Sequence, residues 1–299
     1  MRILITGGSG FIGQPLCVAL VDQGHRVGVV SRSPDRSARV LPAGVDVRSS
    51  VASFGDFEPE AVINLAGEPI AARRWSARRK KQLIDSRTQT TEALVAMMVA
   101  QQTPPTVFIS ASAVGYYGRC GQETVTEQSP PGEDFSHQLC AEWEQAAQRA
   151  QAHVQRLVRL RIGLVFDQPG GMLDRVVPPF KLGLGAPMGS GRQFMPWVHR
   201  ADVVRAIEFL LNNDTLDGAV NLSAPTPVDN LTFSKALAQH FHRPMVLRLP
   251  EPMLRVMFGE MADLLVYGAR MVPEKLNQAG FRFQYPDLTA ALDAIFPKN

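Results

Sequence analysis

The glycine-rich stretch GGSGFIG at residues 7–13 restricts the folds open to this chain more than any other segment. It follows a short apolar run at 2–6 and opens a segment with helical spacing of apolar residues at 11–23. Glycine lets a strand turn sharply and lets the backbone approach a pyrophosphate without a Cβ, and the N–H groups of the following helix suit an anion. The residues expected to hold the phosphates are Gly7, Gly10, Phe11, Ile12 and Gly13.

Further strands and helices alternate after this opening. Short apolar runs bounded by turn residues predict buried strands, and longer periodic stretches predict helices between them. The expected strands cover 26–31, 45–48, 61–65, 106–110 and 157–166, and the expected helices cover 76–101 and 135–152. This alternation predicts an α/β fold, a Rossmann-like doubly wound sheet of mainly parallel strands.

The end of the second expected strand indicates which dinucleotide binds. An NAD site usually places Asp or Glu there for the ribose hydroxyls, whereas this chain has Ser31 and Arg32, with Arg36 and Arg39 nearby. A carboxylate would repel a 2′-phosphate, and a guanidinium can bind it through two hydrogen bonds. We therefore expect NADP(H); the alternative is that Arg32 is simply a solvated side chain.

The composition changes after residue 166. Residues 167–200 are rich in Gly, Pro and Met, and helices and a strand are expected again between 201 and 242. We expect residues 1–166, together with about 201–242, to form the dinucleotide-binding domain. Residues 167–299 otherwise form a smaller, mostly helical C-terminal lobe for the substrate.

Composition excludes several classes of protein. The chain has 299 residues, 45% hydrophobic and 20% charged, which is typical of soluble globular proteins. No apolar run approaches the ~20 residues that cross a bilayer, and no signal peptide is expected. The three cysteines, too few for a disulfide framework or a metal site, are Cys17, Cys120 and Cys140. A cytoplasmic protein without membrane contact is expected.

Residues 73–81, with the sequence RRWSARRKK, hold six basic side chains. Nucleic-acid binding is one interpretation, but no known nucleic-acid-binding motif accompanies them. A solvated helix start that attracts an anionic substrate or cofactor is favoured, so no nucleic-acid partner is expected.

Several motifs closely resemble the extended short-chain dehydrogenase/reductase superfamily. They are GGSGFIG at 7–13, NLAG at 64–67 and SASAVGYYG at 110–118. Within it, the chain resembles an atypical NAD(P)-binding branch known as the epimerase family, sometimes labelled cell-division inhibitor. The stretches that carry this second resemblance are GEPI at 67–70, RRW at 73–75, SR at 86–87, PFKLGLG at 179–185, PWVH at 196–199 and VPEKL at 272–276.

The resemblance implies a Rossmann-like fold that binds NADP(H) across the carboxyl ends of the strands. It also implies that Leu65, Ala66 and Gly67 pass close to the adenosine side of the cofactor. Arg87 should add a phosphate or ribose contact. By analogy alone, a homodimer would form through the helices at 76–101 and 135–152.

The usual catalytic pair of the superfamily is missing. No tyrosine in the chain is followed four residues later by lysine, so the pair that exchanges the proton elsewhere is absent. Ser112 can still hydrogen-bond a substrate carbonyl or hydroxyl. Tyr116 or Tyr117 could act as general acid, although a structural role is favoured for both tyrosines. His137 and Cys140 are favoured as structural residues. Trp197 and His199 either line the substrate pocket or anchor the lobe.

Two hypotheses of different classes follow. The preferred one is an NADP(H)-binding oxidoreductase or epimerase-like enzyme that acts on an unknown small molecule. The alternative is a non-catalytic NADP(H)-binding protein that senses redox state or regulates a partner.

Overall fold

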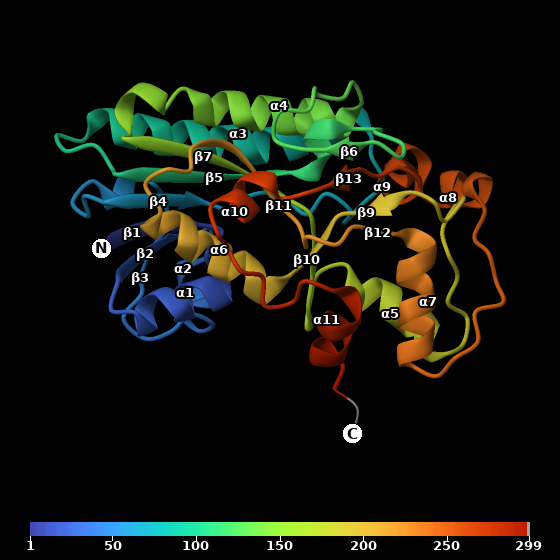
Figure 1. Ribbon diagram of the computed structural model, residues 1–299. Coiled ribbons are helices and arrows are strands. Elements are labelled where there is room, and N and C mark those ends of the chain that lie inside the picture. Colours follow the sequence, from blue (N-terminus) through green and yellow to red (C-terminus); the bar gives the residue numbers. More distant parts are fainter. Residues whose placement is uncertain (298–299) are drawn as a thin grey trace.

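The computed structural model describes residues 1–297 and is built on a seven-stranded parallel sheet with the order β11-β7-β5-β4-β1-β2-β3 (Figure 1). These strands are β1 (Arg2–Thr6), β2 (Arg26–Val30), β3 (Asp46–Arg48), β4 (Ala61–Asn64), β5 (Val107–Ala113), β7 (Arg156–Ile162) and β11 (Gly218–Leu222). The order reverses direction at β1, so the sheet is doubly wound. This confirms the Rossmann-like α/β prediction.

Helices cover both faces of the sheet. The main ones are α1 (Gly13–Asp22), α3 (Ala77–Ala100), α4 (Phe135–Gln148) and α6 (Arg200–Asn212); a short α2 (Pro34–Ala38) follows β2. Leu16 and Ile207, from α1 and α6, belong to one core with the β1 residues Ile3 and Ile5. On the opposite face, side chains from α3 and α4 pack over Leu4 and Phe108. Alternate residues of each strand therefore enter different cores, as a sheet covered on both sides requires.

The strand expected at 157–166 is interrupted at Gly163. A Cβ there would lie 1.9 Å from the Pro196 carbonyl oxygen, so only glycine allows this close approach. Beyond it, β8 (Leu164–Phe166) leaves the large sheet and pairs with β10 (Trp197–His199). The single long strand was therefore a wrong prediction, because the apolar run continues across a break set by tertiary packing.

The C-terminal lobe has its own core, which includes Phe166, Trp197 and Phe233. Its elements are α5 (Leu173–Lys181), β9 (Phe194–Met195), β12 (Val228–Asp229), α7 (Asn230–His240), α8 (Glu251–Phe258), α9 (Asp263–Val266) and α11 (Leu288–Ile295). Of the segment expected to rejoin the first domain, β11 is a strand of the large sheet and α6 packs against that sheet, whereas α7 packs in the second core. Helix α8 ends at Phe258, where Gly259 has a φ of 61°.

Residues 270–278 return from the C-terminal lobe to the side of the large sheet. Strand β13 (Arg270–Met271) pairs in parallel with β6 (Thr124–Val125), and α10 (Glu274–Gln278) lies beside β11 (Figure 1). Within residues 1–297, no helix is both long and apolar enough to cross a membrane.

Candidate functional site

The glycine turn between β1 and α1 is closely packed against itself and against β4. Gly7 has a φ of 76°, and a Cβ on it would lie 2.7 Å from the Leu65 carbonyl. A Cβ on Gly13 would lie 2.2 Å from the Gly7 oxygen. A Cβ on Gly10 would meet only the Gly7 oxygen, at 3.1 Å, apart from its own chain neighbours. Gly7 and Gly13 are thus required by the loop itself, while Gly10 leaves room for a ligand to approach.

Backbone donors at the end of this turn have no partner. In the described part of the chain, the N–H groups of Phe11 and Ile12 make no hydrogen bond, although Gly10 N–H donates to the Gly7 oxygen at 3.0 Å. They precede α1, whose first turn has no acidic residue. Free amides at the positive end of a helix dipole form an anion site. The loop therefore fits a phosphate group.

Part of the C-terminal lobe lies against this turn. The Arg200 guanidinium lies 4.7 Å from the Phe11 ring centroid and pairs with Asp167 at 2.7 Å. Cβ atoms on Gly170 and Gly171 would each come within 2.9 Å of the same ring. Sequence reasoning did not find Arg200, because no local spacing relates it to a turn 189 residues earlier.

Arg32 is already paired with an acid. Its Nη1 donates to Glu68 Oε1 at 2.9 Å, and its side chain is 90% exposed. Hydrogen bonding from Arg32 is the main cause that lowers the pKa of Glu68. Ser31 is turned to Ser37, with 2.6 Å between their hydroxyl oxygens. Arg32 is thus accessible, but a phosphate would have to compete with Glu68 for it.

The segment after β4 is held by hydrogen bonds from its neighbours. Leu65 N–H donates to the Thr6 oxygen at 3.0 Å, and Ala66 N–H to Asn64 Oδ1 at 3.4 Å. Arg87 Nη2 donates to the Glu68 carbonyl at 3.1 Å, and its guanidinium lies 5.0 Å from the Trp143 ring. Burial lowers the pKa of Arg87. Arg87 thus supports the backbone of this segment, next to Gly67.

A row of polar residues crosses three strands near their carboxyl ends. Ser112 on β5 is in register with Arg161 on β7, which is in register with Asn221 on β11. From α4, Glu144 reaches this row: Ser112 Oγ donates to its Oε1 at 2.8 Å, and Arg161 donates to both carboxylate oxygens, at 2.8 and 2.9 Å. Glu144 and Arg161 are only 5% and 3% exposed. This buried ion pair holds Ser112.

The two tyrosines after β5 differ in their surroundings. Tyr117 is buried; its hydroxyl accepts from Arg161 Nη1 at 3.0 Å and donates to Asn221 Oδ1 at 2.6 Å. Burial is the main cause that raises the pKa of Tyr117. The Tyr116 ring lies 3.4 Å from the Arg161 guanidinium carbon, and its hydroxyl has no hydrogen bond within residues 1–297. Tyr117 is therefore part of a closed network, and Tyr116 has the free phenol.

Other residues singled out in the sequence have structural surroundings. Burial raises the pKa of Cys140 to about 11, and its thiol donates to the Ala113 oxygen. His137 contacts the Tyr116 carbonyl through Nδ1 at 2.8 Å. Trp197 is buried in the second core, and His199 Nδ1 accepts from Ala201 N–H to cap α6. Each of the four therefore makes a contact within the fold.

The helix that usually carries the Tyr-x-x-x-Lys pair is pressed against the segment after β5. A Cβ on Gly115 would lie 3.1 Å from Ser136 Cβ and 3.3 Å from Cys140 Sγ. These two residues of α4 have the four-residue spacing of the missing pair. Gly115 thus lets the segment after β5 lie close to Ser136 and Cys140 of α4.

The basic stretch 73–81 is partly neutralised. Arg79 pairs with Glu68 at 3.5 Å and Lys81 with Asp85 at 2.6 Å. Lys80 pairs with Glu260 of the C-terminal lobe at 2.5 Å. Three of its six cations therefore serve contacts within the protein.

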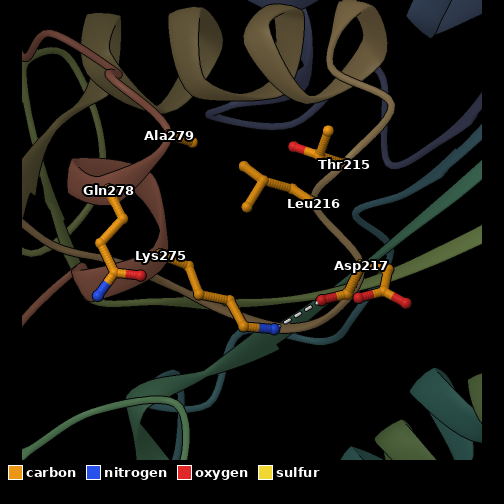
Figure 2. Close-up of a pocket in the computed structure, with 6 residues that line it drawn as sticks. All are labelled: Thr215, Leu216, Asp217, Lys275, Gln278 and Ala279. Carbon is orange, nitrogen blue, oxygen red and sulfur yellow. Dashed lines mark hydrogen bonds between the residues drawn. The ribbon is translucent and has the colours of Figure 1, made fainter.

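A depression of about 280 Å³ lies at the amino end of β11, the opposite end of the sheet from the glycine turn. Figure 2 shows Lys275 reaching across it from α10 to the Asp217 carbonyl, which it contacts at 2.7 Å. Neither the glycine turn nor Ser112 lines it. It is therefore distinct from the candidate site.

Comparisons with known proteins agree with this arrangement. The model of the NAD dependent epimerase/dehydratase family matches residues 3–223, and that of a domain of unknown function, DUF1731, matches residues 249–295. The Mycobacterium tuberculosis epimerase family protein MT2273 is 41% identical over 297 residues, covering 97% of this chain and 96% of its own. The mouse epimerase family protein SDR39U1 is 36% identical, with 99% of both chains covered. The crystal structure of human SDR39U1 with NADPH matches with a TM-score of 0.89 and 31% identity, covering 99% of both chains.

Proposed function

Because the chain belongs to the NAD-dependent epimerase/dehydratase family, we propose that it is an NADP(H)-binding oxidoreductase or epimerase-like enzyme that acts on a small molecule. The pair of unpartnered N–H groups at Phe11 and Ile12 carries the cofactor proposal, because they offer a ready site for the pyrophosphate. The NADPH in the structure of human SDR39U1 supports it.

The residues that would hold NADP(H) lie at the carboxyl ends of β1, β2 and β4. The glycine turn would bind the pyrophosphate, and the segment 65–67 would lie along the adenosine. Arg32 would bind the 2′-phosphate and exchange its contact with Glu68 for the stronger charge of a phosphate. Gly10 would let the cofactor approach the backbone closely.

When bound, the nicotinamide supplies hydride transfer. The protein's part is to orient the substrate oxygen and to manage its proton. Because the Ser112 hydroxyl uses its hydrogen in the bond to Glu144, its oxygen would act only as an acceptor of a hydrogen bond from a substrate hydroxyl. Tyr116 has a free phenol that could exchange a proton with the substrate. Tyr117 would act through Arg161, since both of its hydrogen bonds are already made within the protein.

The cofactor proposal is tested by calorimetric titration of NADPH and NADH. Arg32→Ala should raise the NADPH dissociation constant by about tenfold to a hundredfold, the value of a hydrogen bond to a charged group, and leave NADH binding nearly unchanged. Arg149→Ala is the matched control, because it removes an exposed arginine paired with Glu92 away from the turn. Equal loss for both nucleotides would contradict the assignment of Arg32.

The catalytic proposal is tested by a screen of metabolites with NADPH oxidation or NADP⁺ reduction as the readout. For any substrate found, Ser112→Ala should lower turnover by about a hundredfold or more. The control is Ser234→Ala, a buried serine of α7 in the second core. Unchanged turnover in Ser112→Ala would remove Ser112 from the mechanism.

A second candidate function is a non-catalytic NADP(H)-binding protein. It is favoured by Ser136 and Cys140, which have the spacing of the usual catalytic pair but neither of its functional groups. NADPH binding without turnover of any compound in the screen would support this reading over the enzyme.

We also propose a reducing cytoplasm as the compartment, because all three cysteines are free thiols. A homodimer through α3 and α4 would be detected by sedimentation as twice the monomer mass of 32.8 kDa.

A further inference from the structure

A continuous chain of hydrogen bonds links Ser112 to Val272, in the C-terminal unit formed by residues 249–295. From Ser112 it passes through Glu144 and Arg161 to the Tyr117 hydroxyl, which donates to Asn221 Oδ1. Asn221 Nδ2 then donates to the Val272 carbonyl at 3.1 Å. The partners of Asn221 fix the orientation of its amide. The Tyr117 hydroxyl accepts from Arg161 and therefore donates to the Asn221 oxygen, while the Val272 carbonyl can only accept and therefore faces the Asn221 nitrogen.

The segment 268–275 is fixed at several points along its length. Ser223 Oγ donates to the Met271 oxygen at 3.0 Å, and Lys275 N–H donates to Glu127 Oε1 at 3.2 Å. Glu127, itself buried, also accepts from Asn221 N–H at 3.0 Å. A Cβ on Gly268 would lie 1.9 Å from the Phe194 oxygen. The Lys275 side chain adds the contact to Asp217 shown in Figure 2.

The same segment packs against the tyrosines of the candidate site. Ala269 and Met271 are fully buried in a small core with Tyr117 and Val125, and Tyr116 packs against this core. Strand β13 pairs with β6, which belongs to the loop that follows these tyrosines. The C-terminal unit therefore supports the candidate site through side-chain packing, backbone pairing and hydrogen bonds.

We propose that residues 269–275 are a structural part of the candidate active site, and that Asn221 is the positioning residue that couples them to Ser112 through Tyr117, Arg161 and Glu144. This assigns a role to the C-terminal domain of unknown function. The inference rests on the proposed function only in taking Ser112 as a catalytic group. The glycine turn contributes no residue to this chain of hydrogen bonds, so cofactor binding should be independent of it.

Coupling between two regions is reciprocal, so it is tested from both ends. From the site end, Tyr117→Phe removes the hydroxyl that Asn221 accepts from. Hydrogen exchange at the Val272 and Lys275 amides should become about tenfold faster, the effect of one buried hydrogen bond. Exchange in α7 should stay unchanged, as should exchange at Val272 and Lys275 in the control Tyr285→Phe, whose phenol lies outside the chain of hydrogen bonds.

From the C-terminal end, Ser223→Ala releases the Met271 carbonyl without touching Tyr117. The ¹³Cζ NMR signal of Tyr117, identified by its loss in Tyr117→Phe, should shift, because it reports the hydrogen bonding of the phenol. Ser234→Ala should leave that signal in place. This second variant keeps the test valid if Tyr117→Phe does not fold.

Three outcomes would overturn the coupling: unchanged exchange at Val272 and Lys275, a uniform rise in exchange across the whole protein, or an unmoved Tyr117 signal in Ser223→Ala. The NADPH dissociation constant, measured on the same samples, should stay within about twofold of wild type. If the wild-type protein does not bind NADPH, the proposed function is contradicted but the hydrogen-exchange result still holds. Failure of the proposed function and failure of the coupling are therefore distinguishable.

Discussion

At the scale of single residues, Glu144 makes the contacts that organise the candidate site. Its carboxylate accepts from Ser112 and from two nitrogens of Arg161, and Arg159 lies 3.6 Å away. Burial opposes the charge of Arg161, but the hydrogen bonds and charge of Glu144 outweigh it and raise the pKa of Arg161. Each charge in this pair therefore depends on the other.

Removing one partner of a buried ion pair leaves the other charge without compensation. Glu144→Ala should lower the free energy of unfolding by about 3–5 kcal/mol, measured by urea denaturation. Glu92→Ala breaks the exposed pair with Arg149 and should cost about 0–1 kcal/mol. Equal effects of the two substitutions would show that the Glu144 pair is not buried as described.

Ser112 could be selected from the sequence because it lies in a recognisable stretch, SASAVGYYG at 110–118, near the end of an expected strand. Glu144 and Arg161 could not. Their meeting depends on the register of β5 with β7 and on the face that α4 presents to them. In the sequence, Arg161 is one of two arginines in the apolar run at 157–166, and Glu144 is one of several polar residues on a helix.

At the scale of elements, α3 begins with an unfavourable distribution of charge. Its N-cap Ser76 accepts from Arg79 N–H, but the first turn contains no acidic residue, and four cations occupy positions 78–81. Cations near a helix N-terminus oppose the helix dipole. Glu68 and Glu260 offset part of this charge by pairing with Arg79 and Lys80.

Arg78 is exposed and has no ion-pair partner in the part of the chain that the structure describes. Arg78→Glu should therefore raise the free energy of unfolding by about 0.3–1 kcal/mol in low salt. Gln89→Glu, an exposed change in the middle of the same helix, should have a smaller effect. A destabilised Arg78→Glu protein would indicate that the Arg78 side chain makes a favourable interaction in the folded state.

The periodic patterns predicted most strands and the long helices, because burial on one or both faces of an element determines the spacing of its apolar residues along the sequence. They did not predict the break at Gly163 or the departure of β8 from the sheet. Both depend on the approach of Pro196, 33 residues later, and local spacing carries no information about such a contact.

At the scale of the whole molecule, the two halves of the chain meet beyond the carboxyl ends of the strands of the large sheet. Arg200 and Gly170–Gly171 pack on Phe11 of the glycine turn, while residues 269–275 pack beside the tyrosines of the candidate site. The glycine turn and Arg32 could be found from sequence because their signals are local. The pairing of Arg32 with Glu68 could not, since it joins the ends of two strands.

The most direct test of the central claim is hydrogen exchange at Phe11 and Ile12 with and without NADPH. These amides have no partner among the described residues, so they should exchange rapidly in the free protein and about tenfold or more slowly when a phosphate accepts from them. Amides of α11, in the far lobe, should not change. If NADPH binds but leaves Phe11 and Ile12 unprotected, the glycine turn is not the phosphate site.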